Sequence, residues 1–114
     1  NFTMAFSLLT ENRGRVAIIT LTGELDASVA GQLRDAVDKI SHTEVERLVL
    51  DMTNLDYMAS AGLRGLVFAK QKMGKVDIYI VGAHDAVLET IEMTGFHHSV
   101  FMVDTYDPAV IEAF

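Results

Sequence analysis

The chain has 114 residues, of which 50% are hydrophobic and 22% are charged, with one proline and no cysteine. This composition is typical of a globular domain long enough to bury one core, and it excludes disulfides and cysteine-ligated metal sites. The formal net charge is −7 and the nine Lys and Arg residues are scattered, which argues against direct binding to nucleic acid. No apolar stretch approaches the roughly 20 residues that span a bilayer, and the start lacks the charged and apolar regions of a signal peptide. We therefore expect a cytoplasmic protein that does not bind membranes, with one domain over residues 1–114 and residues 1–3 as an expression remnant.

Two short apolar runs open the chain, Phe6 to Leu9 and Val16 to Leu21. Asn12 and Gly14 lie among the polar residues between them, which predicts an antiparallel hairpin of two strands. The pair Thr22-Gly23 is predicted to end the second strand.

The first predicted helix has two candidate N-caps, Asp26 and Ser28, and ends near Ser41. Its apolar residues recur at spacings of four, four and three, so they form one stripe for the core. These residues are Val29, Leu33, Val37 and Ile40.

Strands and helices then alternate to the end of the chain. The predicted strands are Leu48 to Met52, Val76 to Val81 and Val100 to Val103, and the predicted helices run from Ser60 to about Met73, from Asp85 to about Gly95, and from Asp107-Pro108 to the end. Strands separated by helices of some 12 to 15 residues imply right-handed crossovers and a parallel sheet. The sequence therefore predicts a single-domain α/β fold, with a mixed, mostly parallel sheet of about five strands and about four helices.

Ser60 stands where the strand that ends at Met52 gives way to a helix. A serine at a helix N-terminus can cap the helix, or its hydroxyl can carry an anion such as a phosphoryl group beside unpaired backbone N–H groups. A third reading, a hydrolase nucleophile, is disfavoured because a nucleophile elbow needs Gly where Met58 stands and no base is placed nearby. We assign no catalysis to the chain.

Three short motifs resemble those of bacterial anti-sigma factor antagonists, whose domain is shared with the cytoplasmic tails of sulphate transporters (the STAS domain). The run Tyr-Met-Ala-Ser-Ala-Gly-Leu at residues 57–63 is similar to their Asp-Ser-Ser/Thr-Gly-Leu signature. The run Leu-Thr-Gly-Glu-Leu-Asp at residues 21–26 is similar to their Thr-Gly-Glu-Leu-Asp block, and Glu-Met-Thr-Gly-Phe at residues 92–96 to their late Thr/Ser-Gly-Leu turn. The resemblance covers nearly the whole chain in order and spacing. It departs from the family at Ala59, where the motif has Asp.

The resemblance implies a protein-binding regulator that is switched by phosphorylation of Ser60. The implied partner is an anti-sigma factor with serine kinase activity, which would bind the ATP, and a PP2C-type phosphatase would reverse the modification. The implied partner-binding residues surround the serine: Thr22, Glu24, Asp26, Tyr57, Met58, Ala59, Ala61, Gly62 and Leu63. Several of these residues also have structural readings. Asp26 is a candidate cap, Met58 and Leu63 are typical core residues, and Gly62 with Gly65 suits either close helix packing or a flat contact surface.

Two further functions remain open at this stage. An adaptor or scaffold subunit would keep the same surface without phosphorylation, and Ala59 favours that reading. A small-molecule-binding or lipid-binding domain would need an apolar pocket. We expect no cofactor and no metal, because the adjacent side chains of His97 and His98 diverge and no carboxylate completes a ligand spacing with His84. The carboxylates Asp51 and Asp56 likewise have no predicted pocket around them.

Overall fold

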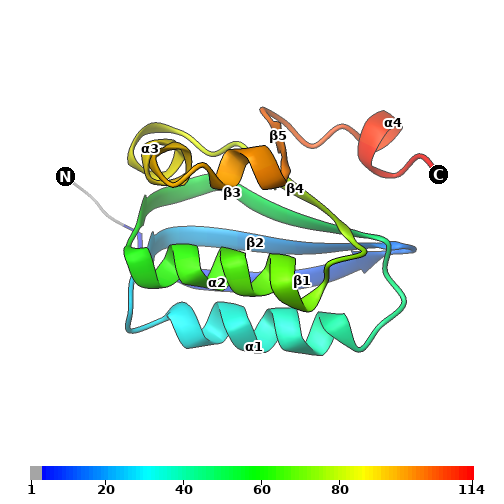
Figure 1. Ribbon diagram of the computed structural model, residues 1–114, viewed down its shortest axis with the longest axis horizontal. Coiled ribbons are helices and arrows are strands. Elements are labelled where there is room, and N and C mark those ends of the chain that lie inside the picture. The colour runs from blue at the N-terminus through cyan, green and yellow to red at the C-terminus, as the bar shows by residue number, and fades with distance from the viewer. Residues whose placement is uncertain (1–3) are drawn as a thin grey trace.

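A mixed five-stranded sheet in the order β1-β2-β3-β4-β5 carries the fold (Figure 1). The computed structural model describes residues 4–114, so the predicted expression remnant at residues 1–3 lies outside the described residues. The strands are β1 (Ser7–Arg13), β2 (Val16–Leu25), β3 (Arg47–Met58), β4 (Asp77–Val81) and β5 (Phe101–Val103), and the helices are α1 (Ala30–Ser41), α2 (Ser60–Lys72), α3 (Asp85–Met93), the short 3₁₀ helix η1 (Phe96–Ser99) and α4 (Pro108–Ile111). Only β1 is antiparallel to its neighbour, and the other pairs are parallel. The predicted mixed, mostly parallel sheet with four α-helices is confirmed.

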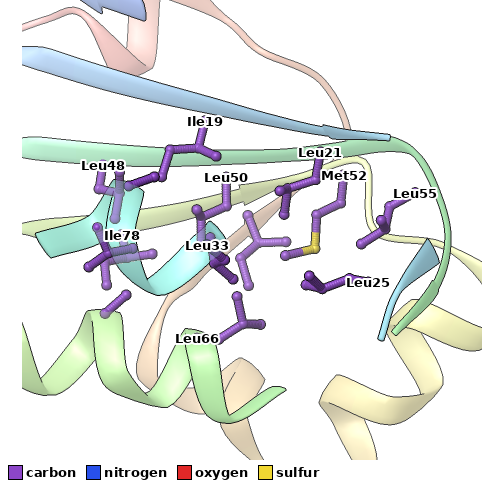
Figure 2. Packing of buried hydrophobic residues seen from close by; sticks show 14 of the residues in the cluster. Ile19, Leu21, Leu25, Leu33, Leu48, Leu50, Met52, Leu55, Leu66 and Ile78 are labelled. Carbon is purple, nitrogen blue, oxygen red and sulfur yellow. The ribbon is translucent and has the colours of Figure 1, made fainter. Parts of the chain in front are cut away.

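The main core lies between one face of the sheet and the helices α1, α2 and α3. Alternate residues of β2 point to this face, as in Ala17, Ile19 and Leu21, because successive side chains of a strand point to opposite sides. Figure 2 shows Ile19 and Leu21 in the same cluster as Leu33 of α1 and Leu66 of α2. The predicted stripe of α1 supplies Leu33, Val37 and Ile40 to this core. Figure 1 shows α1 and α2 side by side, with both N-termini at the end of the sheet where β2 and β3 stop.

The opposite face of the sheet carries a smaller apolar cluster that includes Val16, Ile18 and Val49. The C-terminal segment covers this cluster through Ile111 of α4, which is 1% exposed. α4 begins as its sequence predicts, because Pro108 occupies the first turn and the Asp107 carboxylate accepts a hydrogen bond from the Ala109 N–H at 3.0 Å.

Two strands are longer than the sequence predicts. β2 does not end at Thr22-Gly23 but continues to Leu25. The register between β2 and β3 shifts on either side of this pair, and Gly23 has a φ of +86°. Beyond the shift, Glu24 and Leu25 pair with β3 again. β3 does not end at Met52 but continues to Met58 through a mostly polar stretch that pairs only with β2. The η1 helix between α3 and β5 was not predicted.

Candidate functional site

Ser60 is the first residue of α2, and its side chain is exposed. The N-cap position belongs to Ala59, which has extended backbone angles (φ −80°, ψ 169°) and whose carbonyl accepts the N–H of Leu63 at 3.1 Å. Ala59 has no side chain that can accept a hydrogen bond, so α2 begins without a side-chain cap. The capping role considered for Ser60 is therefore wrong, because its hydroxyl lies one residue too late in the helix.

The end of β2 holds the start of α2 in place. In the parallel register, Glu24 lies opposite Tyr57 and Leu25 lies opposite Met58. The backbone N–H of Ala59 then donates to the carbonyl of Leu25 at 2.9 Å. The segment around Glu24 and the segment around Ser60 are therefore adjacent, as expected for the carboxyl ends of neighbouring parallel strands.

Gly62 allows α2 to approach β2 closely. A Cβ on Gly62 would lie 2.8 Å from Cγ and 2.9 Å from the carbonyl oxygen of Leu25, and 2.9 Å from Cγ of Met58. Gly65, about one turn later, faces Leu33 of α1. A Cβ on Gly65 would lie 2.9 Å from the Cδ2 atom of Leu33. Both glycines are buried, which favours close helix packing over an exposed contact surface as the reason for them.

The residues predicted to contact a partner divide by exposure into three groups. Glu24, Tyr57 and Ser60 are exposed, Asp26, Ala59, Ala61 and Leu63 are partly exposed, and Thr22, Met58 and Gly62 are buried. Tyr57 is 45% exposed, so its ring is accessible from solution. The exposed and partly exposed residues form the accessible surface, which we call the serine surface. Of the three buried residues, Met58 and Gly62 pack against each other at the start of α2, whereas Thr22 lies within β2, paired with Ser7 and Asn54.

Asp26 forms a turn before α1 and does not cap the helix. Its carboxylate accepts hydrogen bonds from the hydroxyl of Ser28 at 2.6 Å and from the backbone N–H of Ser28 at 2.9 Å. These bonds, the hydroxyl first, hold the pKa of Asp26 below its ordinary value. The N-cap of α1 is Val29, which provides no side-chain cap, so the prediction of Asp26 or Ser28 as the N-cap is wrong. At the serine surface, Asp26 is an ionised carboxylate in a fixed turn.

Two exposed residues of α2 near Ser60 were not predicted. Arg64 and Val67 are exposed and follow the serine by four and seven residues, so they share its side of the helix. The spacing alone could have identified them.

The structure also bears on the other readings of the sequence. Among residues 4–114, no group of three or more His, Asp and Glu side chains could hold a metal ion. The prediction that the side chains of His97 and His98 diverge is wrong, because their ring centres lie 3.9 Å apart in the η1 helix. Asp51 accepts hydrogen bonds from the backbone N–H and the hydroxyl of Thr53, at 3.0 and 2.7 Å, which accounts for it structurally. Two hollows of about 320 and 330 Å³ lie between β1 and α1 near Thr10, Lys39 and Ile40, away from the serine surface. No helix within residues 4–114 is long and apolar enough to cross a bilayer.

Comparison with known proteins agrees with this fold. The family model described as STAS domain matches residues 7–109. A curated relative, the anti-sigma-F factor antagonist RsfB of Mycobacterium tuberculosis, is 24% identical over 96 residues, which cover 83% of this chain and 79% of the relative. A crystal structure of an anti-sigma factor antagonist from Mycobacterium paratuberculosis superposes with a TM-score of 0.85 at 23% identity, covering 96% of both chains.

The anti-sigma factor antagonist SpoIIAA is similar in both of its forms. Its unphosphorylated form gives a TM-score of 0.79 at 21% identity, covering 95% of this chain and 94% of SpoIIAA. The phosphorylated form of the Bacillus protein gives 0.73 at 19% identity, covering 95% and 97%. The match of the family model over nearly all described residues, together with the shared topology, shows that the chain belongs to the STAS domain family.

Proposed function

We propose that this protein is an anti-sigma factor antagonist, which binds an anti-sigma factor with serine kinase activity and is switched by phosphorylation of Ser60. The observation that carries the proposal is the exposed hydroxyl of Ser60 at the first residue of α2, beside the exposed Tyr57 and Glu24. A kinase needs an accessible hydroxyl, and a partner needs apolar and polar side chains around it. The serine surface offers both.

The comparisons support the proposal through the roles of similar proteins. RsfB and the protein from Mycobacterium paratuberculosis are anti-sigma factor antagonists, and SpoIIAA is known with and without a phosphate. A single-domain organisation over residues 1–114, a cytoplasmic location and reversal by a PP2C-type phosphatase are parts of the same proposal. The chain itself is assigned no catalysis.

The proposed modification is a transfer of the γ-phosphoryl group of ATP. The Oγ atom of Ser60 forms a bond to the γ-phosphorus, the bond between that phosphorus and the β,γ-bridging oxygen breaks, and ADP leaves. The proton of the hydroxyl passes to a base of the kinase. The partner provides the ATP site, and this chain contributes the nucleophilic hydroxyl.

The added charge explains how such a switch would work. A phosphoserine carries about −1.5 to −2 charges at pH 7, and burying it in an interface without a cationic partner group is unfavourable by several kcal/mol. Glu24 and Asp26 already place negative charge beside the serine. A loss of about 3 to 4 kcal/mol of binding free energy weakens affinity by a few hundredfold.

A second candidate function rests on Ala59. Where the family motif has Asp, this chain has an N-cap residue that can neither cap α2 nor arrange Ser60 for a kinase. An adaptor or scaffold subunit that uses the serine surface without being phosphorylated is consistent with this substitution. The phosphorylation rate of Ser60 separates the two candidates.

The test begins with the partner. The protein is used as bait in an extract of its native cells, the captured proteins are identified by mass spectrometry, and the recombinant partner is incubated with the protein and ATP. We expect one phosphate, mapped to Ser60. Phosphate found solely on another residue, such as Ser28 or Thr94, contradicts the assignment.

Titration calorimetry with the same partner then tests the switch. We expect Ser60→Asp to bind at least tenfold more weakly than the wild type and Ser60→Ala to bind about as well, because added charge and not a lost hydroxyl opposes binding. Equal affinity of the two variants contradicts the proposed switch.

A further inference from the structure

Arg64 lies one helical turn after Ser60 on the exposed side of α2. Side chains four residues apart on a helix are neighbours, with Cβ atoms about 5 to 6 Å apart. An anion that precedes a cation by four residues is the favourable order, because it also agrees with the helix dipole. The present side chain at the first position is neutral, so this spacing has no electrostatic effect until Ser60 gains a charge.

Arg64 is available for such a pair, whereas several other cations are already engaged. Lys72 of α2 forms an ion pair with Asp38 at 3.5 Å, and Arg47 donates to backbone carbonyls of the C-terminal segment. The salt bridges found within residues 4–114 include none to Arg64. The next basic residue of α2 is Lys70, which lies six residues, or about 9 Å, further along the helix axis.

The end of β2, which lies next to the segment that begins α2, is acidic. Glu24 is exposed at the end of β2, opposite Tyr57, and Asp26 follows it with its pKa held down by Ser28. Like charges disfavour each other, so a phosphate on Ser60 is repelled from the β2 side. Attraction by Arg64 and repulsion by Glu24 and Asp26 therefore both favour a phosphate that lies along α2, toward Arg64.

We propose that Arg64 is the residue of this chain that holds the phosphate of phosphorylated Ser60. This inference rests on the proposed function, since it requires a phosphate at that position. Arg64 acts here as a positioning residue: it orients the phosphate over the first turn of α2 and partly neutralises it. The guanidinium group suits this role because its fork of N–H donors matches two phosphate oxygens at once.

The pair has a consequence for phosphate mimics. An aspartate at position 60 carries one charge on a short side chain, so it reaches Arg64 less well than a phosphate does. A phosphorylated protein and Ser60→Asp therefore differ in how strongly they depend on Arg64.

The test uses the whole chain with phosphoserine incorporated at position 60 during translation, so that it does not depend on any kinase. The second pKa of the phosphate, ordinarily about 6, is measured by phosphorus NMR titration. We expect Arg64→Gln to raise this pKa by about 0.2 to 0.5 units, because the dianion loses its neighbouring cation. The difference should shrink in about 1 M salt, where the screening length is about 3 Å.

Two matched variants complete the experiment. Lys75→Gln removes the same charge from an exposed residue beyond the end of α2, and should leave the phosphate pKa nearly unchanged. Arg64→Lys keeps the positive charge, so the second pKa of the phosphate should stay close to its value in the wild-type protein. If Arg64→Gln shifts the pKa no more than Lys75→Gln does, Arg64 does not hold the phosphate and the inference is wrong. That outcome leaves the proposed phosphorylation of Ser60 untouched, because only the kinase reaction tests it.

Discussion

Ala59 is the N-cap residue of α2 but cannot act as a side-chain cap. An Asp at this position can accept a hydrogen bond from a free N–H of the first turn, so we expect Ala59→Asp to raise the free energy of unfolding by about 0.5 to 1 kcal/mol. Chemical denaturation of the unphosphorylated proteins measures the gain. After phosphorylation of Ser60 the gain should be smaller, since the new carboxylate lies beside a phosphate dianion.

The variant Ala59→Asn separates capping from charge, because it offers the same hydrogen bond without a carboxylate. It should raise the free energy of unfolding by a similar amount whether or not Ser60 is phosphorylated. If the kinase requires the Asp of the family motif, Ala59→Asp is also phosphorylated faster than the wild type, and Ala59→Asn is not. A fast wild-type reaction that neither substitution changes removes the main support for the unphosphorylated adaptor.

Three helical glycines are expected to respond differently to replacement by alanine. Gly31 of α1 has no atom within 4 Å of the position of an added Cβ, so Gly31→Ala should stabilise the protein by up to about 1 kcal/mol. An added Cβ on Gly62 meets the carbonyl oxygen of Leu25, which cannot rotate away, and Gly62→Ala should destabilise it by about 1 to 3 kcal/mol. Gly65→Ala should fall between them, because the Leu33 methyl group that it meets belongs to a flexible side chain. Thermal unfolding of the three variants gives the order, and a stabilising Gly62→Ala contradicts the close approach of α2 to β2.

The order of strands and helices follows from local sequence, whereas the ends of β2 and β3 do not. Apart from Asp51, the run Leu48 to Met52 is apolar, because both faces of that part of β3 are covered. The next six residues are mostly polar, since β4 no longer lies beside them, and only the ladder with β2 keeps them extended. Pairing between distant segments, and not a local signal, decides where this strand ends.

The candidate site was also only partly predictable from the sequence. The position of Ser60 at the start of a helix follows from sequence, as does the proximity of the segment that contains Glu24. The burial of Met58 and Gly62 could not be derived, because it depends on how closely α2 packs on Leu25. An Asp before a helix can either cap the helix or accept hydrogen bonds within a turn, and the sequence does not decide between the two. In the structure the Asp26 carboxylate forms the turn with Ser28.

His84 connects the extended part of β3 to the start of α3. Its Nδ1 lies 2.9 Å from the Asp85 carboxylate and its Nε2 lies 3.0 Å from the carbonyl of Thr53. The Asp85 carboxylate first, and then the Thr53 carbonyl, raise the pKa of His84 above its ordinary value, with a smaller contribution from Asp56. A raised pKa in the folded state means that the protonated ring stabilises the fold.

This stabilisation is fully present below the unfolded pKa of about 6.5 and is lost as the pH rises through the higher folded value. We therefore expect His84→Gln to destabilise the protein more at pH 5.5 than at pH 9, with a difference of roughly 0.2 to 1 kcal/mol because the ring is solvent-screened. Urea unfolding at the two pH values measures it, and His98→Gln in η1 is the matched control. A larger loss at pH 9 contradicts the assignment of these contacts to the protonated ring.

Arg47 holds the C-terminal segment over the second face of the sheet. It donates hydrogen bonds to the carbonyls of Val110, Ile111 and Ala113 at 2.9, 2.9 and 2.7 Å, and its side chain is 19% exposed. Its guanidinium also lies 4.3 Å from the centre of the Phe114 ring. One residue at the start of β3 therefore satisfies three carbonyl groups, two in the last turn of α4 and one just beyond it.

We expect Arg47→Leu to lower the free energy of unfolding by about 1 to 3 kcal/mol, because carbonyls lose their donors and Ile111 is held less firmly over the sheet. Limited proteolysis should then cut the C-terminal segment before the rest of the chain. Arg13→Leu, which removes an exposed ion pair to Glu112 and a cation–π contact with Tyr106, should cost no more than about 1 kcal/mol. Equal effects of the two variants contradict the special role of Arg47.

The same arrangement separates the two ends of the chain in space. Backbone oxygens of Met4 and Ala5 lie against Gly23, close to the serine surface. α4 lies at the other end of β3, where Arg47 binds it (Figure 1). The 12 residues from Arg47 to Met58 correspond to roughly 35 Å along the strand. A sensor chip, fluorophore or fusion partner joined after Phe114 therefore leaves Ser60 facing solution. A group attached at Met4 lies close to the surface whose binding is to be measured, so a position near α4 suits immobilisation better.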